Sequence, residues 1–469
     1  MTTNQQIWKK LLSANRLKDA IKGKTTNEDN LDIRNSFERD CDRITYSYPF
    51  RRLQDKTQVI PLPIIDFVHT RLTHTLEVAT VGRSLGKIVE NFLIKQNDIL
   101  ENQRGQIPTI IYAACLAHDI GNPPFGHSGE DSISDYFRGK QGLKSIKENF
   151  QDTEMKNVKI CDLQNFEGNA MGFRLLTKYE DVGMNLTCAV LATFTKYPRQ
   201  SFITGESEDT RWNDQRTSQK KYGFFYTELE EFKVVANETG MIQLKNGPED
   251  FTWCRHPLSF LLEAADDICY RIIDLEDGFR IGKIPFIEAE NHLLPIAKLD
   301  DNFKEEKYSK LSNENRKFSY LRALSINVLI ISCAKVFEQK YPEILSGEFD
   351  DDLLKNVDNE KILKGIKGIK DTVKKYIYKS TDVLTLEAAG YEVLGGLISD
   401  YIEASNICSD CNVVSNKKAK KFFDLIPEEY QHLENEEHYS RYLKIACYVA
   451  GMTDSYALNL FQKLRGIKT

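Results

Sequence analysis

The 469-residue sequence predicts an all-α fold with one minor β-hairpin. Two observations predict it. Apolar residues recur at steps of three and four over most of the chain, and only one stretch is rich enough in β-branched residues to suggest paired strands. At 41% apolar and 28% charged residues, the chain can bury a large core without disulfides. We expect a helical core with its N-terminal segment at residues 1–299 and a C-terminal helical region at 300–469 packed on it.

Each predicted element has its own pattern. The first long helix begins at Arg71, where residues 78, 81, 85, 88, 89 and 92 form one apolar stripe. Similar stripes predict helices through residues 110–118, 258–275, 320–337 and 388–404. Residues 230–247 contain two short β-branched runs around a turn and predict a surface hairpin. Because we find no internal repeat and no linker rich in Pro, Gly or Ser, the elements should form one helical body.

Charge and composition exclude several classes of protein. The 63 basic and 69 acidic residues leave a net charge of −6, which gives no global attraction to nucleic acid or to an anionic membrane. No apolar stretch approaches the roughly 20 residues that span a bilayer, and the start lacks the apolar core of a signal peptide. We therefore expect a cytoplasmic protein. The close pair Cys408 and Cys411 lacks a second pair of ligands, which favours chance spacing over a zinc knuckle.

A histidine and a carboxylate stand together at the end of one predicted helix. His118 and Asp119 close an apolar run, and the glycines and prolines of IGNPPFGH stop the helix directly after them. A divalent metal would explain this pair, because it offsets the desolvation of the carboxylate and keeps the imidazole neutral. The loop then leads to His127, with Glu130 three residues later on the first turn of the next helix. These two side chains could face the same point.

Two further segments extend this site. His74 lies on the helix that begins at Arg71, where a lone histidine would more often be a core residue. Asp266, Tyr270 and Asp274 fall at i, i+4 and i+8 on a strongly apolar helix, so they do not belong to an ordinary solvated face. Two histidines and two carboxylates with open positions for water and phosphate suit Mn²⁺ or Mg²⁺. The predicted ligands are His74, His118, Asp119 and Asp266.

These motifs, in this order, resemble a known family. PFRRLQDKTQV, RLTHTLEV, HDIGNPPFGHSGE, FEGNAMG, FTKYPR, EAADDICY and AGMTDSYA are similar to the HD-domain dNTP triphosphohydrolases, especially the bacterial dGTPase branch, from about Asp42 to the C-terminus. The resemblance implies a helical HD-domain core that hydrolyses a dNTP to a deoxynucleoside and tripolyphosphate, by attack of water at the α-phosphate. The branch favours dGTP among the substrates.

The resemblance also implies roles for single residues. The predicted metal ligands fall on the family's ligands. His127 falls on the histidine that faces the α-phosphate, as an acid or as a group that orders water, and Glu130 falls on its acidic partner. Arg71 matches an α-phosphate contact and Tyr270 the aromatic floor under the deoxyribose. The remaining matches are groups that bind the sugar 3′-hydroxyl, Gln58 and Asp274, and polar or phosphate contacts, Asn122, Asn169, Lys196, Tyr197 and Lys221.

Two other functions remain open at this point. Another HD phosphohydrolase, acting on a nucleoside monophosphate, a cyclic dinucleotide or a guanosine tetraphosphate, would need the same metal set but not Gln58 or Tyr270. A nucleotide sensor or single-strand nucleic-acid binder would use the pocket only to bind, and the lysine-rich stretch at 364–375 could hold a polyanion. The family implies a homo-oligomer, a tetramer or hexamer, with single-stranded DNA or a nucleotide as a possible effector.

Overall fold

The computed structural model describes residues 2–26, 33–59, 68–150, 156–178, 183–203, 209, 211, 215–244, 250–409, 416–433 and 436–467. Over these residues the chain is helical, with β-pairing limited to isolated bridges such as Thr57 with Thr70, so the all-α prediction is confirmed. Cys411, one member of the close cysteine pair, lies outside the described residues.

Residues 3–280 contain thirteen of the α-helices that the structure describes. They are α1 (Thr3–Leu11), α2 (Leu17–Ile21), α3 (Ser36–Tyr46), α4 (Tyr48–Arg52), α5 (Arg71–Lys95), α6 (Gln106–Ala117), α7 (His127–Arg138), α8 (Lys140–Asn149), α9 (Lys156–Gln164), α10 (Gly168–Lys178), α11 (Cys188–Phe194), α12 (Leu229–Thr239) and α13 (Ser259–Arg280). A short 3₁₀ helix, η1 (Leu53–Asp55), follows α4.

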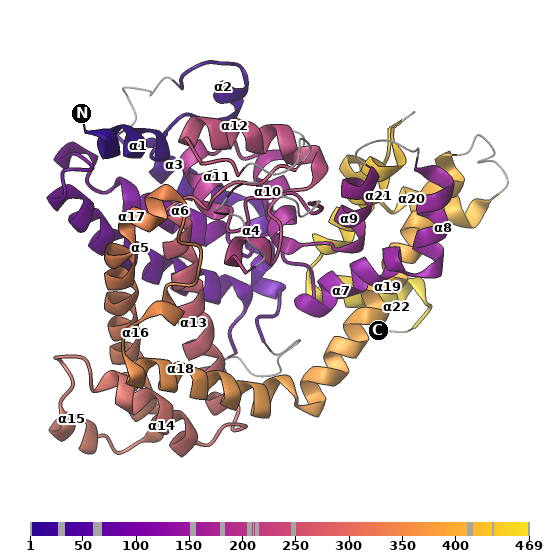
Figure 1. Cartoon of the computed structure of the whole chain (residues 1–469). Helices are drawn as coiled ribbons and strands as arrows, with labels where there is room; N and C mark the ends of the chain where they lie inside the picture. The colour runs from indigo at the N-terminus through magenta and orange to yellow at the C-terminus, as the bar shows by residue number, and fades with distance from the viewer. Residues whose placement is uncertain are drawn as a thin grey trace.

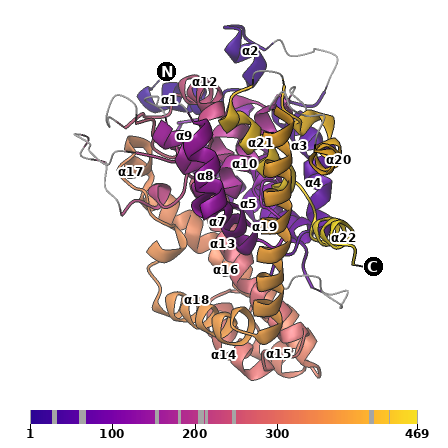
Figure 2. The same cartoon turned by 90° about the vertical axis from the view of Figure 1, so that its right-hand side faces the viewer.

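The second half continues with α14 (Phe286–Ala297), α15 (Glu305–Ser309), α16 (Glu314–Gln339), α17 (Tyr341–Ser346), α18 (Glu360–Val373), α19 (Thr381–Ser409), α20 (Lys417–Asp424), α21 (His438–Ala450) and α22 (Asp454–Leu464). A short π-helical turn, η7 (Lys374–Tyr378), extends α18. In Figure 1, α5, α13 and α16 lie side by side in the left-hand body, and α7, α8 and α19–α22 gather on the right. Figure 2 shows α19 running along the molecule from the end near α18 toward α21. The division at residue 300 stays a prediction.

Close packing between α5 and α6 sets the frame of the molecule. Thr70 caps α5, because its side chain accepts a hydrogen bond from the Thr73 backbone and the Thr73 hydroxyl accepts one from the Thr70 backbone. Gly82 and Gly86 face α6 so closely that a β-carbon on Gly86 would lie 2.8 Å from Cα of Pro108. The N-terminal end of α5 is thereby held beside the C-terminal end of α6, and α13 packs against both helices.

The predicted hairpin at 230–247 is wrong. Residues 229–239 form the helix α12, whose buried Phe232, Val235 and Ala236 repeat at helical spacing. Gly240 ends this helix with a φ of +67°, so the expected hairpin turn is a helix C-cap. Beyond it, Gln243 makes only a single bridge to Trp253 before the undescribed residues 245–249.

One described helix, α16, is long and apolar enough by composition to cross a membrane, which the sequence analysis did not anticipate. Half of its most apolar window is buried. It packs against α5, α13 and α14.

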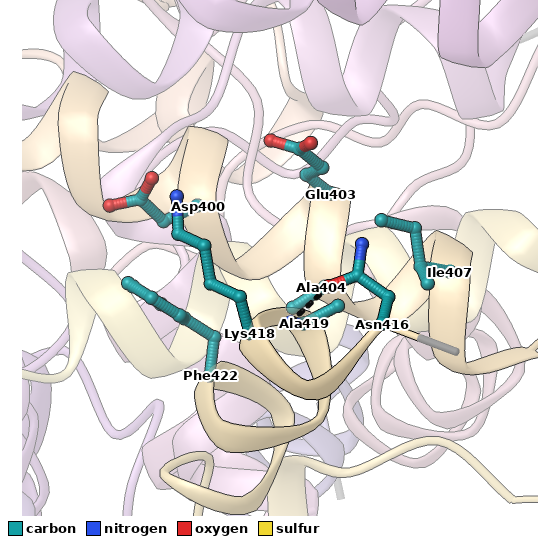
Figure 3. A pocket seen from close by; sticks show the side chains of 8 residues that line it. All are labelled: Asp400, Glu403, Ala404, Ile407, Asn416, Lys418, Ala419 and Phe422. Carbon is teal, nitrogen blue, oxygen red and sulfur yellow. Dashed lines mark hydrogen bonds between the residues drawn. The ribbon is translucent and has the colours of Figure 1, made fainter. Parts of the chain in front are cut away.

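The C-terminal helices pack on one another and on α7. Asn416 begins α20, because its side-chain oxygen accepts a hydrogen bond from the Ala419 backbone at 3.0 Å. A hollow between α19 and α20 is lined by Asp400 and Glu403 on one helix and by Lys418 and Phe422 on the other (Figure 3). None of the predicted site residues lines this hollow.

Candidate functional site

Three predicted metal ligands converge where α5, α6 and α13 meet. His74 lies on the first turn of α5, His118 follows the last turn of α6, and Asp266 lies on α13. One side-chain donor atom from each lies within 4.8 Å of the other two, and this is the one such group among the described residues. The Asp266 Oδ1 atom is 3.2 Å from His74 Nε2 and 3.6 Å from His118 Nε2. This grouping agrees with the ligand prediction.

His118 has the chemistry of a metal ligand. Its Nδ1 atom lies 2.7 Å from the carbonyl oxygen of Cys115, which can only accept, so Nδ1 carries the proton. The Nε2 atom then has a free lone pair, and it is buried without a hydrogen-bond partner. Burial lowers the pKa of His118, which keeps the ring neutral. A buried lone pair directed at a carboxylate is explained by a cation between them, so these residues fit a divalent metal.

Asp119 lies beside this cluster and is held by two other predicted site residues. Its Oδ1 atom is 3.5 Å from His118 Nε2 and accepts a hydrogen bond from Asn122 at 2.6 Å. Its Oδ2 atom accepts one from Arg71 at 2.9 Å. Burial alone would raise the pKa of Asp119, but neighbouring positive charge, including the Arg71 guanidinium, outweighs burial and brings the pKa to about 2. The carboxylate is therefore charged and available to a metal.

Lys196 is paired with a predicted ligand instead of standing free for phosphate. Its ammonium lies 3.0 Å from Asp266 Oδ2, and burial, which lowers its pKa, is outweighed by this carboxylate. The net pKa of Lys196 is raised, so the residue is cationic and balances Asp266. Its neighbour Tyr197 is half-buried, and burial raises its pKa although Lys196 and Lys221 act in the opposite direction.

His127 begins α7, and its Nδ1 atom lies 2.9 Å from Glu130 Oε2. The Glu130 side chain is buried and also accepts a hydrogen bond from the Gly168 backbone at 2.8 Å. Burial raises the pKa of Glu130, but His127 and Lys221 lower it more, so the carboxylate stays charged. The His127 side chain is 85% exposed, which leaves its Nε2 atom open to a bound molecule. The predicted pair is therefore formed, with Glu130 orienting the imidazole.

Glu167 was not predicted, yet it organises two residues that were. Its Oε1 atom accepts hydrogen bonds from Asn169 at 2.7 Å and from Lys221 at 3.1 Å. Lys221 also lies 3.8 Å from Glu130, so all these groups adjoin the His127 pair. Burial raises the pKa of Glu167. A carboxylate directly before Gly168 and Asn169 was the one sequence signal that could have identified it.

Tyr270 and Asp274 are joined by a residue that sequence analysis missed. The Tyr378 hydroxyl, at the end of η7, contacts both the Tyr270 hydroxyl and the Asp274 Oδ2 atom. Because Tyr378 has one proton, we assign it as a donor to Asp274 and an acceptor from Tyr270. Burial raises the pKa of Asp274 to about 7, and its Oδ1 atom is buried without a partner. Gln58, after η1, likewise has a buried Oε1 atom without a partner.

Comparisons with known proteins match two regions of this chain to family models and nearly the whole chain to curated relatives. The HD domain matches residues 71–179, and the phosphohydrolase-associated domain matches residues 358–463. The chain is 42% identical over 464 residues to the deoxyguanosinetriphosphate triphosphohydrolase-like protein of Synechocystis sp., covering 98% of this chain and 99% of that one. It is 34% identical to the like-named protein of Listeria monocytogenes (98% and 99% covered) and 31% identical to the deoxyguanosinetriphosphate triphosphohydrolase of Salmonella enteritidis (92% and 94% covered).

Proposed function

Since this chain belongs to the HD-domain family that includes deoxyguanosinetriphosphate triphosphohydrolases and deoxyguanosinetriphosphate triphosphohydrolase-like proteins, we propose that it is a metal-dependent dNTP triphosphohydrolase. It would cleave a dNTP into a deoxynucleoside and intact tripolyphosphate, by attack of water at the α-phosphorus. The observation that carries the proposal is the neutral, unpartnered His118 Nε2 facing Asp266, in the same region as an exposed His127 backed by Glu130.

The cofactor would be Mn²⁺ or Mg²⁺, held by His74, His118 and Asp266 with Asp119 beside them. When bound, such an ion lowers the pKa of a water molecule and neutralises charge on the phosphoryl group. Carboxylate oxygens suit these hard ions, and imidazole extends the choice toward Mn²⁺.

The cations of the site would hold the triphosphate. Arg71 and Lys196 are paired with the carboxylates of Asp119 and Asp266. With Asp119 and Asp266 serving as metal ligands, the Arg71 guanidinium and the Lys196 ammonium would be available to phosphate oxygens, and Lys221 would extend this set from the Glu167 side. A protein with a net charge of −6 needs such a local concentration of cations to bind a polyanion.

His127 would handle the proton. Its Nδ1–H donates to Glu130, which fixes the ring and leaves Nε2 as the reactive atom. In the neutral form Nε2 accepts a hydrogen bond from water and so orders the nucleophile. In the protonated form it delivers a proton to the 5′-oxygen of the leaving deoxynucleoside. The pH dependence of kcat distinguishes the two roles, because the first requires His127 deprotonated and the second protonated.

The sugar would lie against Tyr270 and Tyr378. The free Oδ1 atom of Asp274 and the free Oε1 atom of Gln58 are acceptors suited to the sugar 3′-hydroxyl. An aromatic surface under C2′ offers a ribose hydroxyl no partner, and an unpaired buried hydroxyl costs about 1–3 kcal/mol. Deoxyribonucleotides should therefore be preferred. The preference for dGTP, a tetramer or hexamer, and activation by a nucleotide or single-stranded DNA are proposed from the family alone. A cytoplasmic location is proposed from the sequence.

The test is product analysis. The purified chain is incubated with Mn²⁺ or Mg²⁺ and each of the four dNTPs, and phosphorus NMR identifies the phosphate product. Tripolyphosphate with an equal amount of deoxynucleoside supports the proposal. Pyrophosphate or orthophosphate from the dNTPs, or turnover confined to monophosphates, cyclic dinucleotides or guanosine tetraphosphate, would refute it. Nucleotide binding without turnover would indicate a sensor, and a His127→Ala preparation controls for contaminating phosphatases.

A further inference from the structure

The loop that delivers His127 has an unfavourable backbone conformation. Residues 119–126 connect α6 to α7, and Phe125 has a φ of +60° although it carries a β-carbon. Gly126 follows with a φ of +63°. Non-glycine residues adopt the left-handed region at a cost and keep it only where neighbouring groups enforce it. The structure must therefore contain groups that hold this loop.

One of these groups is Asp454, the first residue of α22. Its carboxylate is 1% exposed, and Oδ1 accepts a hydrogen bond from the Phe125 backbone at 3.1 Å. Its Oδ2 atom accepts one from the Thr57 backbone at 3.0 Å and another from the Thr57 hydroxyl. Thr57 directly precedes Gln58. A single carboxylate of the C-terminal region thus connects the strained loop to the segment that carries a candidate sugar contact.

A buried lysine makes a second connection between the same parts of the chain. Lys56 is buried, with 3% of the residue exposed. Its ammonium donates hydrogen bonds to the carbonyl oxygen of Asn122 at 2.5 Å and to that of Ala450 at 3.1 Å. Asn122 belongs to the loop, and Ala450 ends α21. The Phe125 ring also packs against Gly390 of α19, where a β-carbon would lie 2.9 Å from Phe125 Cβ. Three C-terminal helices therefore fix the loop from one side.

We propose that Asp454 and Lys56 are positioning residues, through which the C-terminal helices α21 and α22 hold the 119–126 loop in the shape that presents His127 and Asn122 to the substrate. This inference rests on the proposed function for its kinetic consequence, but not for its structural one. Their hydrogen bonds reach the loop at Asn122 and Phe125, beyond the predicted ligand Asp119, so their loss should affect the chemical step more than metal binding.

The test compares Asp454→Ala with Ser455→Ala in the full-length, Mn²⁺-loaded protein. Ser455 is the matched control, because it lies on the same turn and bonds Asp55 at 2.9 Å without touching the loop. Hydrogen exchange is followed by mass spectrometry over residues 119–130, together with Mn²⁺-induced thermal stabilisation, kcat and KM. For Asp454→Ala we expect faster exchange in this segment, a fall in kcat of about tenfold to a hundredfold, a smaller change in KM and unchanged metal stabilisation.

A second variant keeps the test decisive if Asp454→Ala does not fold. Asp454→Asn retains one acceptor, so it should recover part of the protection and part of kcat, while Ser455→Ala behaves as wild type. Wild-type exchange over 119–130 in a folded Asp454 variant would overturn the proposal, as would an equal loss in the Ser455 variant. If the wild type releases no tripolyphosphate, the proposed function fails, and the exchange data still decide whether Asp454 positions the loop.

Discussion

Replacing Asp266 with asparagine tests whether Asp266 is a metal ligand or only a structural carboxylate. In the metal-free protein Asp266 faces two imidazoles and the Lys196 ammonium, 3.0 Å away. At that distance, with an effective dielectric constant of about 20, the attraction between Asp266 and Lys196 is roughly 5 kcal/mol. Removing one partner of a buried pair typically costs about 3–5 kcal/mol of unfolding free energy. Asp266→Asn should therefore be markedly less stable than wild type even in EDTA.

The same variant should lose its response to metal. A ligand that binds only the folded state at 100 times its Kd stabilises a protein by about 2.7 kcal/mol. Wild type should gain stability of that order from Mn²⁺, and Asp266→Asn should gain none over the same concentration range. Thermal denaturation in EDTA and across an Mn²⁺ titration measures both effects, and elemental analysis of the dialysed proteins gives metal content.

A double variant distinguishes the two causes. Adding Lys196→Met to Asp266→Asn removes the unpaired cation, so stability in EDTA should recover while the Mn²⁺ response stays absent. If Asp266→Asn alone kept the wild-type Mn²⁺ response, Asp266 would not be a ligand. If the double variant regained the response, the loss would come from a displaced Lys196. Unchanged stability of the single variant in EDTA would refute the argument about Lys196 itself.

Three further predictions concern other parts of the molecule. His127→Ala should lower kcat with dGTP by roughly 10²–10⁴ while leaving Mn²⁺-induced stabilisation intact, and a loss of that stabilisation would contradict a proton-handling role. Tyr270→Ala should reduce the ratio of kcat/KM for dGTP over GTP, and steady-state kinetics showing an equal ratio would place sugar discrimination elsewhere. Burial raises the pKa of Asp162 to about 7 from an ordinary value of 3.8, so its protonated form stabilises the fold. That stability is fully present below about pH 4 and is lost as pH rises through 7. The Tm should thus fall between about pH 4 and 7, and Asp162→Asn should flatten this fall relative to wild type.

Periodic patterns in the sequence carried most of the fold prediction. The stripes of α5, α13, α16 and α19 predicted buried helices, because the side chains that pack a helix recur within one segment. The hairpin at 230–247 failed for a local reason. Val234 and Val235 suggested a strand, but Phe232 and Ala236 bury the same side as Val235, and Gly240 is a helix cap.

In the candidate site, too, local patterns identify some residues, and others depend on contacts between distant parts of the chain. The structure brings His74, His118 and Asp266 together, and helix ends and helical spacing mark these residues in the sequence. The roles of Tyr378 and Asp454 could not be predicted from such local patterns, because their partners lie over one hundred residues away and only tertiary packing brings them together. Lys196 was expected at phosphate, but nothing local indicates that its ammonium pairs with Asp266 across 70 residues.

The two glycines of α5 bear on how closely the imidazoles of His74 and His118 approach each other. Gly82 and Gly86 lie two and three turns beyond His74, and α6 rests directly on their Cα atoms, with Cys115 Sγ only 2.6 Å from a β-carbon built on Gly82. The gap between the imidazoles of His74 and His118 therefore depends on two missing methyl groups. An alanine at either position would push the two helices apart and so widen the space between the two imidazoles, although neither glycine lies among the predicted ligands.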